Sequence, residues 1–468
     1  MEFQKHDELE LERKSTWLEL KMELPLGIPT QQFLLEKAVC SHGLFMMAPN
    51  HWDPLSNTLT RPLRLHHHHH DHPSSSLIVS ISQHHAASLA VRVHGTHSLS
   101  PQQESALLAQ VSRMLHLSEE EEKTVREFRS MPHLDHQNRS FTGRVFRSST
   151  LFEDMVKCML LCNCQWSRTL SMAQALCELQ LELQNESPRA VSVSGNPKVE
   201  TEDFIPKTPA AKVTGRKGRN SSGVSTKGTF CKKKLELEVA GNASSSNVTL
   251  LPTDVEGNAC HCGKSCVATE EPSSDDSFLQ LPNGREYFNH TGNFPSPSEL
   301  ANLDESFLAK RCNLGYRASR IIKLAQAIVE GKIQLRQLEE LSKDASLSNY
   351  KLLEDQLKQI TGFGPFTRAN VLMCMGYYHV IPTDSETIRH LKQVHSRNSS
   401  SKTIDRDVEE IYGKYEPYQF LAYWSEMLEF YERRFGKMNE MHSSDYKLIT
   451  GSNMRSASKG TSKRKRLS

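Results

Sequence analysis

The stretch from residue 186 to residue 277 most constrains the fold, because it cannot supply a hydrophobic core. Ser, Asn, Thr, Pro, Gly and Lys dominate it, and aromatic residues are few. A segment with so little apolar surface cannot offset the entropy lost on folding. A loop of this length without secondary structure is also uncommon within a compact domain. We therefore expect a disordered insertion over 186–277, with ordered structure on both sides of it.

Before the insertion, strand patterns come first and helical patterns follow. Residues 33–95 alternate apolar and polar positions, as in TLTRPLRL and SLAVRVHG, or are short and β-branched, as in SLIVSIS. After Pro101 the apolar residues recur at helical spacing, and this pattern returns beyond the insertion. Separate runs of strand and helix patterns indicate an α+β fold.

The chain of 468 residues is longer than one compact domain usually is. The changes of pattern divide it into a flexible N-terminus, a sheet with helices, a helical domain in two pieces, the insertion and a basic tail. In that order, the expected bounds are 1–29, 30–148, 149–185 with 278–436, 186–277 and 437–468.

Bulk charge does not argue for a polyanionic partner, since 57 Lys and Arg face 55 Asp and Glu, for a net charge of +2. The eleven cysteines form no regular framework. The N-terminus is too charged for an export signal, and no apolar run of about 18 residues appears. We expect an intracellular protein without membrane contact. The KRKR cluster at Lys463–Arg466 fits a nuclear import signal, so the expected location is the nucleus.

Two short tracts carry metal-binding residue types. The run HHHHHDH over 66–72 has the low complexity of a hairpin tip and lacks the fixed geometry that a metal needs. The segment CHCGKSC over 260–266 lacks a second pair of ligands at zinc-finger spacing. We expect no metal site at either tract.

The stretch TGFGPFTRAN, Thr361–Asn370, predicts a tight turn between two helices. Gly362 and Gly364 permit positive φ and the close approach of another backbone, and Pro365 suits the first helical position. Free amides at such a helix start bind a phosphate, in some cases through a monovalent cation. That arrangement grips a DNA backbone without reading sequence. The alternative is a plain αα-corner that needs no DNA, and Gly-x-Gly alone favours this alternative.

Asp384 follows twenty residues after Gly364, in IPTDSETIRHL, at the start of another predicted helix. One interpretation is structural: Asp384 caps the helix, or Thr383 and Glu386 form a capping box. The other is catalytic. A fixed carboxylate near a phosphate-gripping hairpin stabilises the cationic sugar that develops as an N-glycosidic bond breaks, and it can orient or deprotonate a water molecule.

The hairpin and Asp384 together resemble the helix-hairpin-helix (HhH-GPD) DNA glycosylase superfamily, whose Gly-x-Gly turn and catalytic Asp have this order and spacing. The segments FPSPSELANLDE…NLGYRASRIIKLAQAI and LLCNCQWSRTLSM are similar to its 8-oxoguanine DNA glycosylase branch. APNHWDPLSNTLTRPLRL falls where that family has its N-terminal antiparallel sheet. The resemblance covers about 30–185 and 278–436. It implies a mostly helical, two-lobed fold and a monomeric base-excision repair enzyme that acts on double-stranded DNA containing a damaged base.

The resemblance also implies roles for residues outside the hairpin. Asn163 matches the loop residue that fills the gap left by an extruded base, and Tyr316 matches the wedge beside it. Arg168 and Arg317 match the pair that contacts the orphaned opposite base, which is cytosine in that family. The implied DNA-binding residues are Asn163, Arg168, Tyr316, Arg317, Gly362, Gly364 and Thr367. Each has a structural alternative, as a loop cap, a core side chain or solvated surface.

One departure from the family pattern changes the expected chemistry. The 8-oxoguanine branch has a lysine two residues after the second glycine, which attacks the sugar to form a Schiff base. Here that residue is Phe366, and no lysine follows before Lys392. Water is then the expected nucleophile of a monofunctional enzyme, closer in this respect to the 3-methyladenine glycosylases, which carry an aromatic residue there. Phe366 is a candidate for stacking on a flipped, electron-poor base, with ordinary helix packing as the alternative.

No required cofactor is expected. The iron–sulfur cluster of the endonuclease III branch needs four cysteines after the catalytic Asp, whereas the last cysteine here is Cys374. Two other classes of function stay open. One is a non-catalytic protein that binds damaged or unusually structured DNA, with Asp384 only as a cap. The other is a nuclear interaction protein that works through residues 186–277.

Overall fold

The computed structural model describes residues 19–26, 33–65, 76–132, 134, 141–185 and 291–455. Every described residue belongs to one compact unit, and the structure describes only this unit. The expected insertion, the histidine tract, the CHCGKSC segment and the KRKR cluster lie outside the described residues. Within the described part of the chain, every helix is too short or too polar to cross a lipid bilayer.

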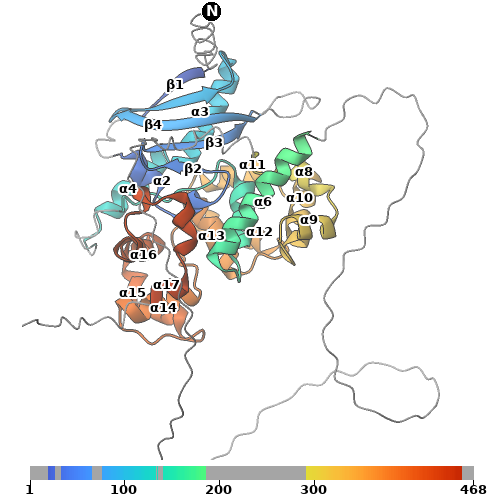
Figure 1. Cartoon of the computed structure of the whole chain (residues 1–468). Coiled ribbons are helices and arrows are strands. Elements are labelled where there is room, and N and C mark those ends of the chain that lie inside the picture. The colour runs from blue at the N-terminus through green and yellow to red at the C-terminus, as the bar shows by residue number, and fades with distance from the viewer. Residues whose placement is uncertain are drawn as a thin grey trace, which may run out of the picture. The chain divides into compact units, whose positions relative to one another are not determined.

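Five antiparallel strands form one sheet in the order β1-β5-β4-β3-β2 (Figure 1). The strands are β1 (Glu19–Pro25), β2 (His51–Asp53), β3 (Thr58–Arg64), β4 (Ser76–His85) and β5 (Ser88–His94). Along β5, Leu89, Val91 and Val93 are buried and alternate with partly exposed residues. One face of the sheet therefore packs on the core, as the period-2 pattern predicts.

The expectation of a flexible start over 1–29 is wrong for residues 19–25, which form the edge strand β1. Leu20, Met22 and Leu24 of this strand are less exposed than Lys21, Glu23 and Pro25 between them. The strand pairs with β5 along its whole length. Its backbone thus uses hydrogen-bonding groups of β5 that would otherwise be free at a sheet edge.

The strand expectation for 33–95 is wrong at its beginning. Residues there form α2 (Leu35–Val39) and the 3-10 helix η1 (Gly43–Met46) before β2 starts. Leu35, Ala38 and Val39 are the buried positions of α2, and their spacing is helical. A five-residue helix is too short for its periodicity to stand out in the sequence.

Helices make up most of the remaining described chain, which confirms the α+β class. The first group is α3 (Pro101–Leu115), α4 (Glu119–Arg129), α5 (Leu151–Leu161), α6 (Trp166–Asn185), α8 (Pro297–Ala301), α9 (Glu305–Arg311), α10 (Arg317–Val329) and α11 (Leu335–Ser342). The second group is α12 (Leu347–Lys358), α13 (Pro365–Cys374), α14 (Ser385–Val394), α15 (Ile404–Tyr412), η2 (Gly413–Tyr415), α16 (Gln419–Phe435), η3 (Met438–Glu440), η4 (Ser443–Leu448) and α17 (Gly451–Arg455). Ser118 begins α4 with a capping box, as its acidic first turn indicates.

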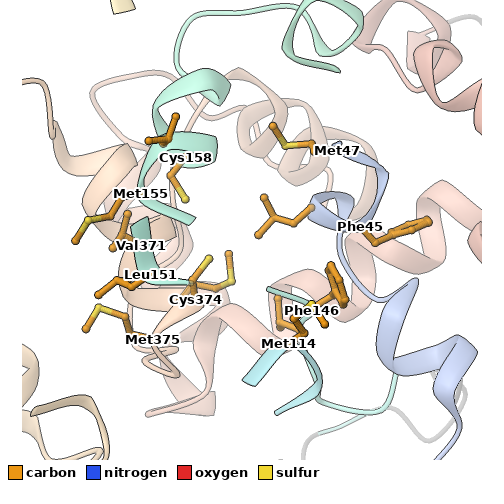
Figure 2. Packing of buried hydrophobic residues seen from close by; sticks show 14 of the residues in the cluster. Phe45, Met47, Met114, Phe146, Leu151, Met155, Cys158, Val371, Cys374 and Met375 are labelled. Atoms are coloured by element: carbon orange, nitrogen blue, oxygen red, sulfur yellow. The ribbon is translucent and has the colours of Figure 1, made fainter. Parts of the chain in front are cut away.

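The core beneath the sheet is rich in sulfur-containing side chains. Figure 2 shows Met155 and Cys158 of α5 in the same packed region as Val371 and Cys374 of α13. All four side chains have no exposed surface. Because α5 and α13 pack directly on each other, the helix that follows the glycine turn is held on the centre of the molecule.

A charged triad is buried between the sheet and α5. Arg61 of β3 donates two hydrogen bonds to the carboxylate of Glu153, of 2.8 and 3.3 Å. Lys157 contacts the same carboxylate at 2.7 Å, and its side chain, like that of Arg61, has no exposed surface. Two cations share one anion here, so their buried charges depend on Glu153.

The expectation of a tail over 437–468 is wrong for residues 437–455, which form η3, η4 and α17. Met438 and Tyr446 are buried. The rings of Tyr446 and Phe45 pack edge-to-face, with 5.5 Å between their centroids. The indole of Trp52 donates a hydrogen bond of 2.8 Å to the carbonyl of Asn439. A few apolar residues in a polar segment are thus enough to fold it onto β2 and η1.

Candidate functional site

The turn between α12 and α13 has the geometry that its two glycines predict, but only one of them needs positive φ. Gly362 has φ +93, whereas Gly364 has φ −73 and is the N-cap of α13. The Phe363 side chain between them is buried, and its amide donates to the carbonyl of Ile360 at 3.1 Å. The turn is anchored from beneath and leaves Gly364 exposed.

The start of α13 is suited to an anion. Gly364 has no side chain to cap the first turn, and Pro365 lies at the first helical position. The amides of Phe366 and Thr367 therefore add to the positive end of the helix dipole without a side-chain cap among the described residues. The Thr367 side chain is directed inward, where its hydroxyl lies 3.0 Å from Cys162 Sγ. Thr367 as a whole is buried, so its side chain is not available at the surface.

Replacing Gly362 with alanine is expected to lower the free energy of unfolding by about 1–2 kcal/mol, because alanine rarely adopts positive φ. A Cβ atom there would also lie 2.5 Å from Arg320 Cδ. Gly364→Ala is the matched control, since its φ is ordinary and its Cβ meets nothing within 4 Å. Urea denaturation of both variants measures the difference. Equal stabilities would contradict a requirement for glycine at residue 362.

The four residues of the predicted wedge region lie close together. Asn163 follows α5 with φ +46 and is exposed, and Arg168 on α6 donates to the Asn313 carbonyl at 3.0 Å. Tyr316, at the start of α10, is 49% exposed although it is a large aromatic residue. These exposed groups leave an aromatic and a polar side chain free to contact a partner.

The predicted role of Arg317, contact with the opposite base, requires an exposed side chain. Arg317 is buried, and its guanidinium donates to the carbonyls of Cys162 and Asn163. The same group lies over the Tyr316 ring, 4.6 Å from its centroid. Arg317 therefore holds the Asn163 loop against α10, and contact with an opposite base stays a prediction for Arg168.

Arg320 was not singled out by the sequence. Its guanidinium lies 4.6 Å from the centroid of the Tyr316 ring, and its side chain packs against Gly362. It thus connects the exposed aromatic to the glycine turn. The helical spacing in RASRIIKL places Arg317 and Arg320 on neighbouring positions of α10, which is the signal that was available.

A cavity of about 500 Å³ lies beside the start of α13. This volume falls in the range of about 300–1,000 Å³ that is typical of small-molecule sites. Apolar side chains, many of them aromatic, line most of its wall, and they come from segments far apart in the sequence. The aromatic lining residues are Phe45, Trp166, Phe366, Phe420, Tyr423, Trp424 and Tyr431. The charged lining residues are Asp384 and Glu386, so the described wall is acidic and contains no lysine or arginine.

Asp384 is the N-cap of α14 and lies at the edge of this cavity. Its Oδ1 accepts the amides of Glu386 and Thr387 at 2.9 Å each, and the Thr387 hydroxyl at 3.2 Å. In the described chain no donor reaches Oδ2. The surrounding protein raises the pKa of Asp384 above its ordinary value, and the hydrogen bonds to Oδ1 oppose this shift. The cap thus fixes one oxygen and leaves Oδ2 without a donor among the described residues.

Phe366 connects the turn to the cavity. It stands in the first turn of α13, two residues from Gly364, and its half-buried ring lines the cavity with Asp384. One short segment therefore contributes both the exposed start of α13 and part of the cavity wall. The role of the ring as a stacking partner stays a prediction.

Two cavity residues had no sequence signal. His42 precedes η1 and contacts the Trp424 ring at 4.5 Å between centroids. Burial lowers the pKa of His42 to about 3, so its imidazole is neutral at physiological pH. The Trp424 indole donates to the carbonyl of Ser41 at 2.7 Å, which joins α16 to the same segment. Their partners are hundreds of residues away in sequence, so no local pattern marks them.

No protein-family model matches this chain, and no curated protein matches it. Among solved structures, it is similar to MBOgg1 in complex with a low-affinity DNA ligand, at 15% identity and a TM-score of 0.46, over 88% of this chain and 99% of that one. It is also similar to 3-methyladenine DNA glycosylase from Archaeoglobus fulgidus, at 13% identity and a TM-score of 0.44, over 89% and 99%. Clostridium acetobutylicum 8-oxoguanine glycosylase/lyase in its apo form gives 12% identity and a TM-score of 0.40, over 81% and 98%.

Proposed function

We propose that this protein is a base-excision repair DNA N-glycosylase that flips a damaged base out of duplex DNA and hydrolyses its N-glycosidic bond. The observation that carries the proposal is the position of Asp384. Its carboxylate lies at the edge of an aromatic cavity whose wall also contains Phe366, from the first turn of the anion-binding helix α13. A phosphate at that helix start and a base in the cavity are compatible with one strand of DNA.

In the proposed reaction the bond between the sugar carbon and the base nitrogen breaks, and its electron pair leaves with the base. The Asp384 carboxylate stabilises the positive charge on the sugar and receives a proton from the attacking water. The water oxygen forms the new bond to the sugar carbon, and the departing base takes up a proton. Products are the free base and an abasic site.

Water is the proposed nucleophile because the described cavity wall has no lysine. The residue in the position of the family's lysine is Phe366, whose ring cannot form a Schiff base. We therefore propose a monofunctional enzyme. The exposed Tyr316 and Asn163 are proposed to fill the stack that the flipped base leaves, and Arg168 to contact the opposite base. The enzyme is proposed to act as a monomer in the nucleus.

The test uses the purified full-length protein on duplexes that each carry one lesion. The panel holds 8-oxoguanine, a 3-methyladenine-type adduct, ethenoadenine, hypoxanthine and uracil, with an unmodified duplex as control. Strand breaks that appear only after alkali identify a water-using glycosylase and its substrate. Breaks that appear without alkali would mean that an amine of the protein attacks the sugar, which contradicts the monofunctional mechanism.

A second candidate is a non-catalytic binder of damaged DNA, which the three hydrogen bonds of the Asp384 cap favour. It predicts tight, salt-sensitive binding to a lesion-containing duplex and no excision on any member of the panel. The nuclear location is tested separately, by the distribution of a fluorescent fusion with and without Lys463–Arg466.

The rate of excision is expected to fall as the solution becomes acidic, because Asp384 must be ionised to act. Its pKa lies above the ordinary 3.8, so the decline should be centred at a pH above that value. Single-turnover rates measured from pH 4 to pH 8 check this. A rate that stays constant down to pH 4 would contradict a catalytic carboxylate at residue 384.

A further inference from the structure

Four side chains that the proposed reaction does not use converge at one point between three helices. His390 lies on α14 and His395 is the C-cap of that helix. Tyr412 is the last residue of α15, and Glu426 lies on α16. Figure 1 shows α14, α15 and α16 together, at the end of the molecule away from the sheet.

The two imidazoles approach the same carboxylate oxygen. Glu426 Oε2 lies 3.1 Å from His390 Nε2 and 2.8 Å from His395 Nε2. The Tyr412 hydroxyl donates to that oxygen at 2.6 Å. The ligand atoms of His390, His395 and Glu426 all lie within 4.8 Å of one another. The His390 side chain has no exposed surface, while those of His395 and Glu426 are each 24% exposed.

Hydrogen bonding alone gives an unbalanced account of this arrangement. Each imidazole Nε2 lies near both Oε2 and the Tyr412 hydroxyl, which is 3.2 Å from His390 Nε2 and 3.0 Å from His395 Nε2, while Oε1 of Glu426 receives no donor from the described chain. Ligands about 2.0–2.1 Å from a tetrahedral zinc ion lie about 3.3 Å from each other. The distances of 2.8 and 3.1 Å are slightly shorter than this value. One ion between the three atoms would account for their convergence.

We propose that His390, His395 and Glu426 form a binding site for a divalent transition metal ion, with zinc as the ion that fits best. Two imidazole nitrogens and one carboxylate oxygen are a common ligand set for zinc. The Tyr412 hydroxyl would orient the carboxylate ligand through its hydrogen bond. The Tyr412 hydroxyl is the fourth polar atom of the cluster, because it lies 2.6–3.2 Å from each of the three ligand atoms.

The ion would stabilise the helix on which the Asp384 carboxylate depends. The His390 ring packs edge-on against Tyr423, with 5.3 Å between centroids. The Tyr423 hydroxyl lies 3.2 Å from Thr387 Oγ1, which in turn lies 3.2 Å from Asp384 Oδ1. A metal that joins α14 to α16 would therefore hold the C-terminal half of α14 directly and support its N-cap, Asp384, through Tyr423 and Thr387. The metal would affect the position of the Asp384 carboxylate without contacting it, since these side chains lie between them.

The test measures zinc uptake by the full-length protein after treatment with a chelator. The six histidines of the 66–72 tract are replaced by serine in every sample, so that they add no background. His395→Ala and Glu426→Gln remove one ligand each. His97→Ala is the matched control, because it removes an exposed histidine far from the site. Calorimetric titration with zinc chloride gives the stoichiometry and affinity.

The reference protein and His97→Ala are expected to take up one equivalent of zinc more than the two ligand variants. Their affinity for that ion should exceed that of the ligand variants by at least the roughly 10–100-fold that is typical of losing an outer partner of a metal site. Zinc at about 100 times its Kd should also raise their Tm by several degrees.

Equal zinc uptake by all four proteins would overturn the proposal. Because a variant can fail to fold, the Tm of the reference protein is also measured with zinc alone and with zinc plus excess chelator, which needs no ligand variant. An unchanged Tm there would equally overturn the proposal. Neither measurement reads base excision, so the outcome is independent of the proposed function.

Discussion

Replacing Asp384 with asparagine is expected to lower the rate of base excision by about 10³-fold or more, since the charge that stabilises the sugar cation and accepts the water proton is lost. The fold should be unaffected, because asparagine is as good an N-cap as aspartate. The amides of Glu386 and Thr387 keep an acceptor at the same position. Single-turnover excision on the best duplex of the lesion panel gives the rate, and urea denaturation gives the stability.

The matched control for this variant is Glu386→Gln, because Glu386 is the other acidic residue of the cavity wall. Its carboxylate pairs with Arg389 at 2.6 Å, so it is already neutralised by a neighbour. Its excision rate should stay within a few-fold of wild type. If Asp384→Asn excised the base at the wild-type rate, the carboxylate would be only a cap, and the non-catalytic binder would be the better account.

Replacing Glu153 with glutamine is expected to destabilise the protein by about 3–5 kcal/mol, the largest stability effect that the structure predicts. Glutamine has nearly the same shape, but Arg61 and Lys157 would keep two fully buried charges without an anion. Urea denaturation at pH 7 measures the loss. The exposed pair of Glu330 and Lys332 supplies the control, since Glu330→Gln should cost about 0–1 kcal/mol.

The same residue gives a pH dependence with a defined sign. Burial raises the pKa of Glu153, but the nearby Arg61 and Lys157 outweigh it and hold this pKa at about 2, below the ordinary 4.5. Its contribution to stability is therefore complete above about pH 4.5 and is lost as the pH falls toward 2. The Glu153→Gln variant should lack this part of the acid dependence.

A Glu153→Gln variant that does not fold would leave no transition to measure. A triple variant, Arg61→Met, Glu153→Leu and Lys157→Met, then separates the explanations. Removing all three charges together should restore much of the stability, because no unpaired charge is left in the core. A triple variant that is as unstable as Glu153→Gln would show that shape, and not charge, limits this position.

Local signals in the sequence predicted the helices well, but they missed strand β1 and the folded segment 437–455. Ser118 caps α4 because its own side chain and that of Glu121 form the capping box, which needs no distant partner. Strand β1 was missed because its only partner, β5, lies about 70 residues further along the chain. Residues 437–455 were missed because the residues that contact them, Phe45 at Tyr446 and Trp52 at Asn439, are near the other end of the chain.

The candidate site was predicted in part for the same reason. Gly362, Phe366 and Asp384 belong to short motifs whose local structure depends on nearby residues. The cavity beside them could not be predicted, because His42, Trp166 and Trp424 come together only in the folded chain. The inward-facing Thr367 hydroxyl and the buried Arg317 show the converse: a residue can match a motif while its side chain serves packing.

The segment after α16 supplies part of the cavity wall, which bears on how the base specificity of such a protein can change in evolution. Met438, Ile449, Thr450 and Met454 of this segment line the cavity, and they lie outside the glycine turn and α13 in the sequence. Under the proposed function, the grip on the phosphate backbone and one wall of the base pocket are thus encoded by separate stretches of chain. Substitutions in the late segment can change which base is accepted while the grip is inherited unchanged.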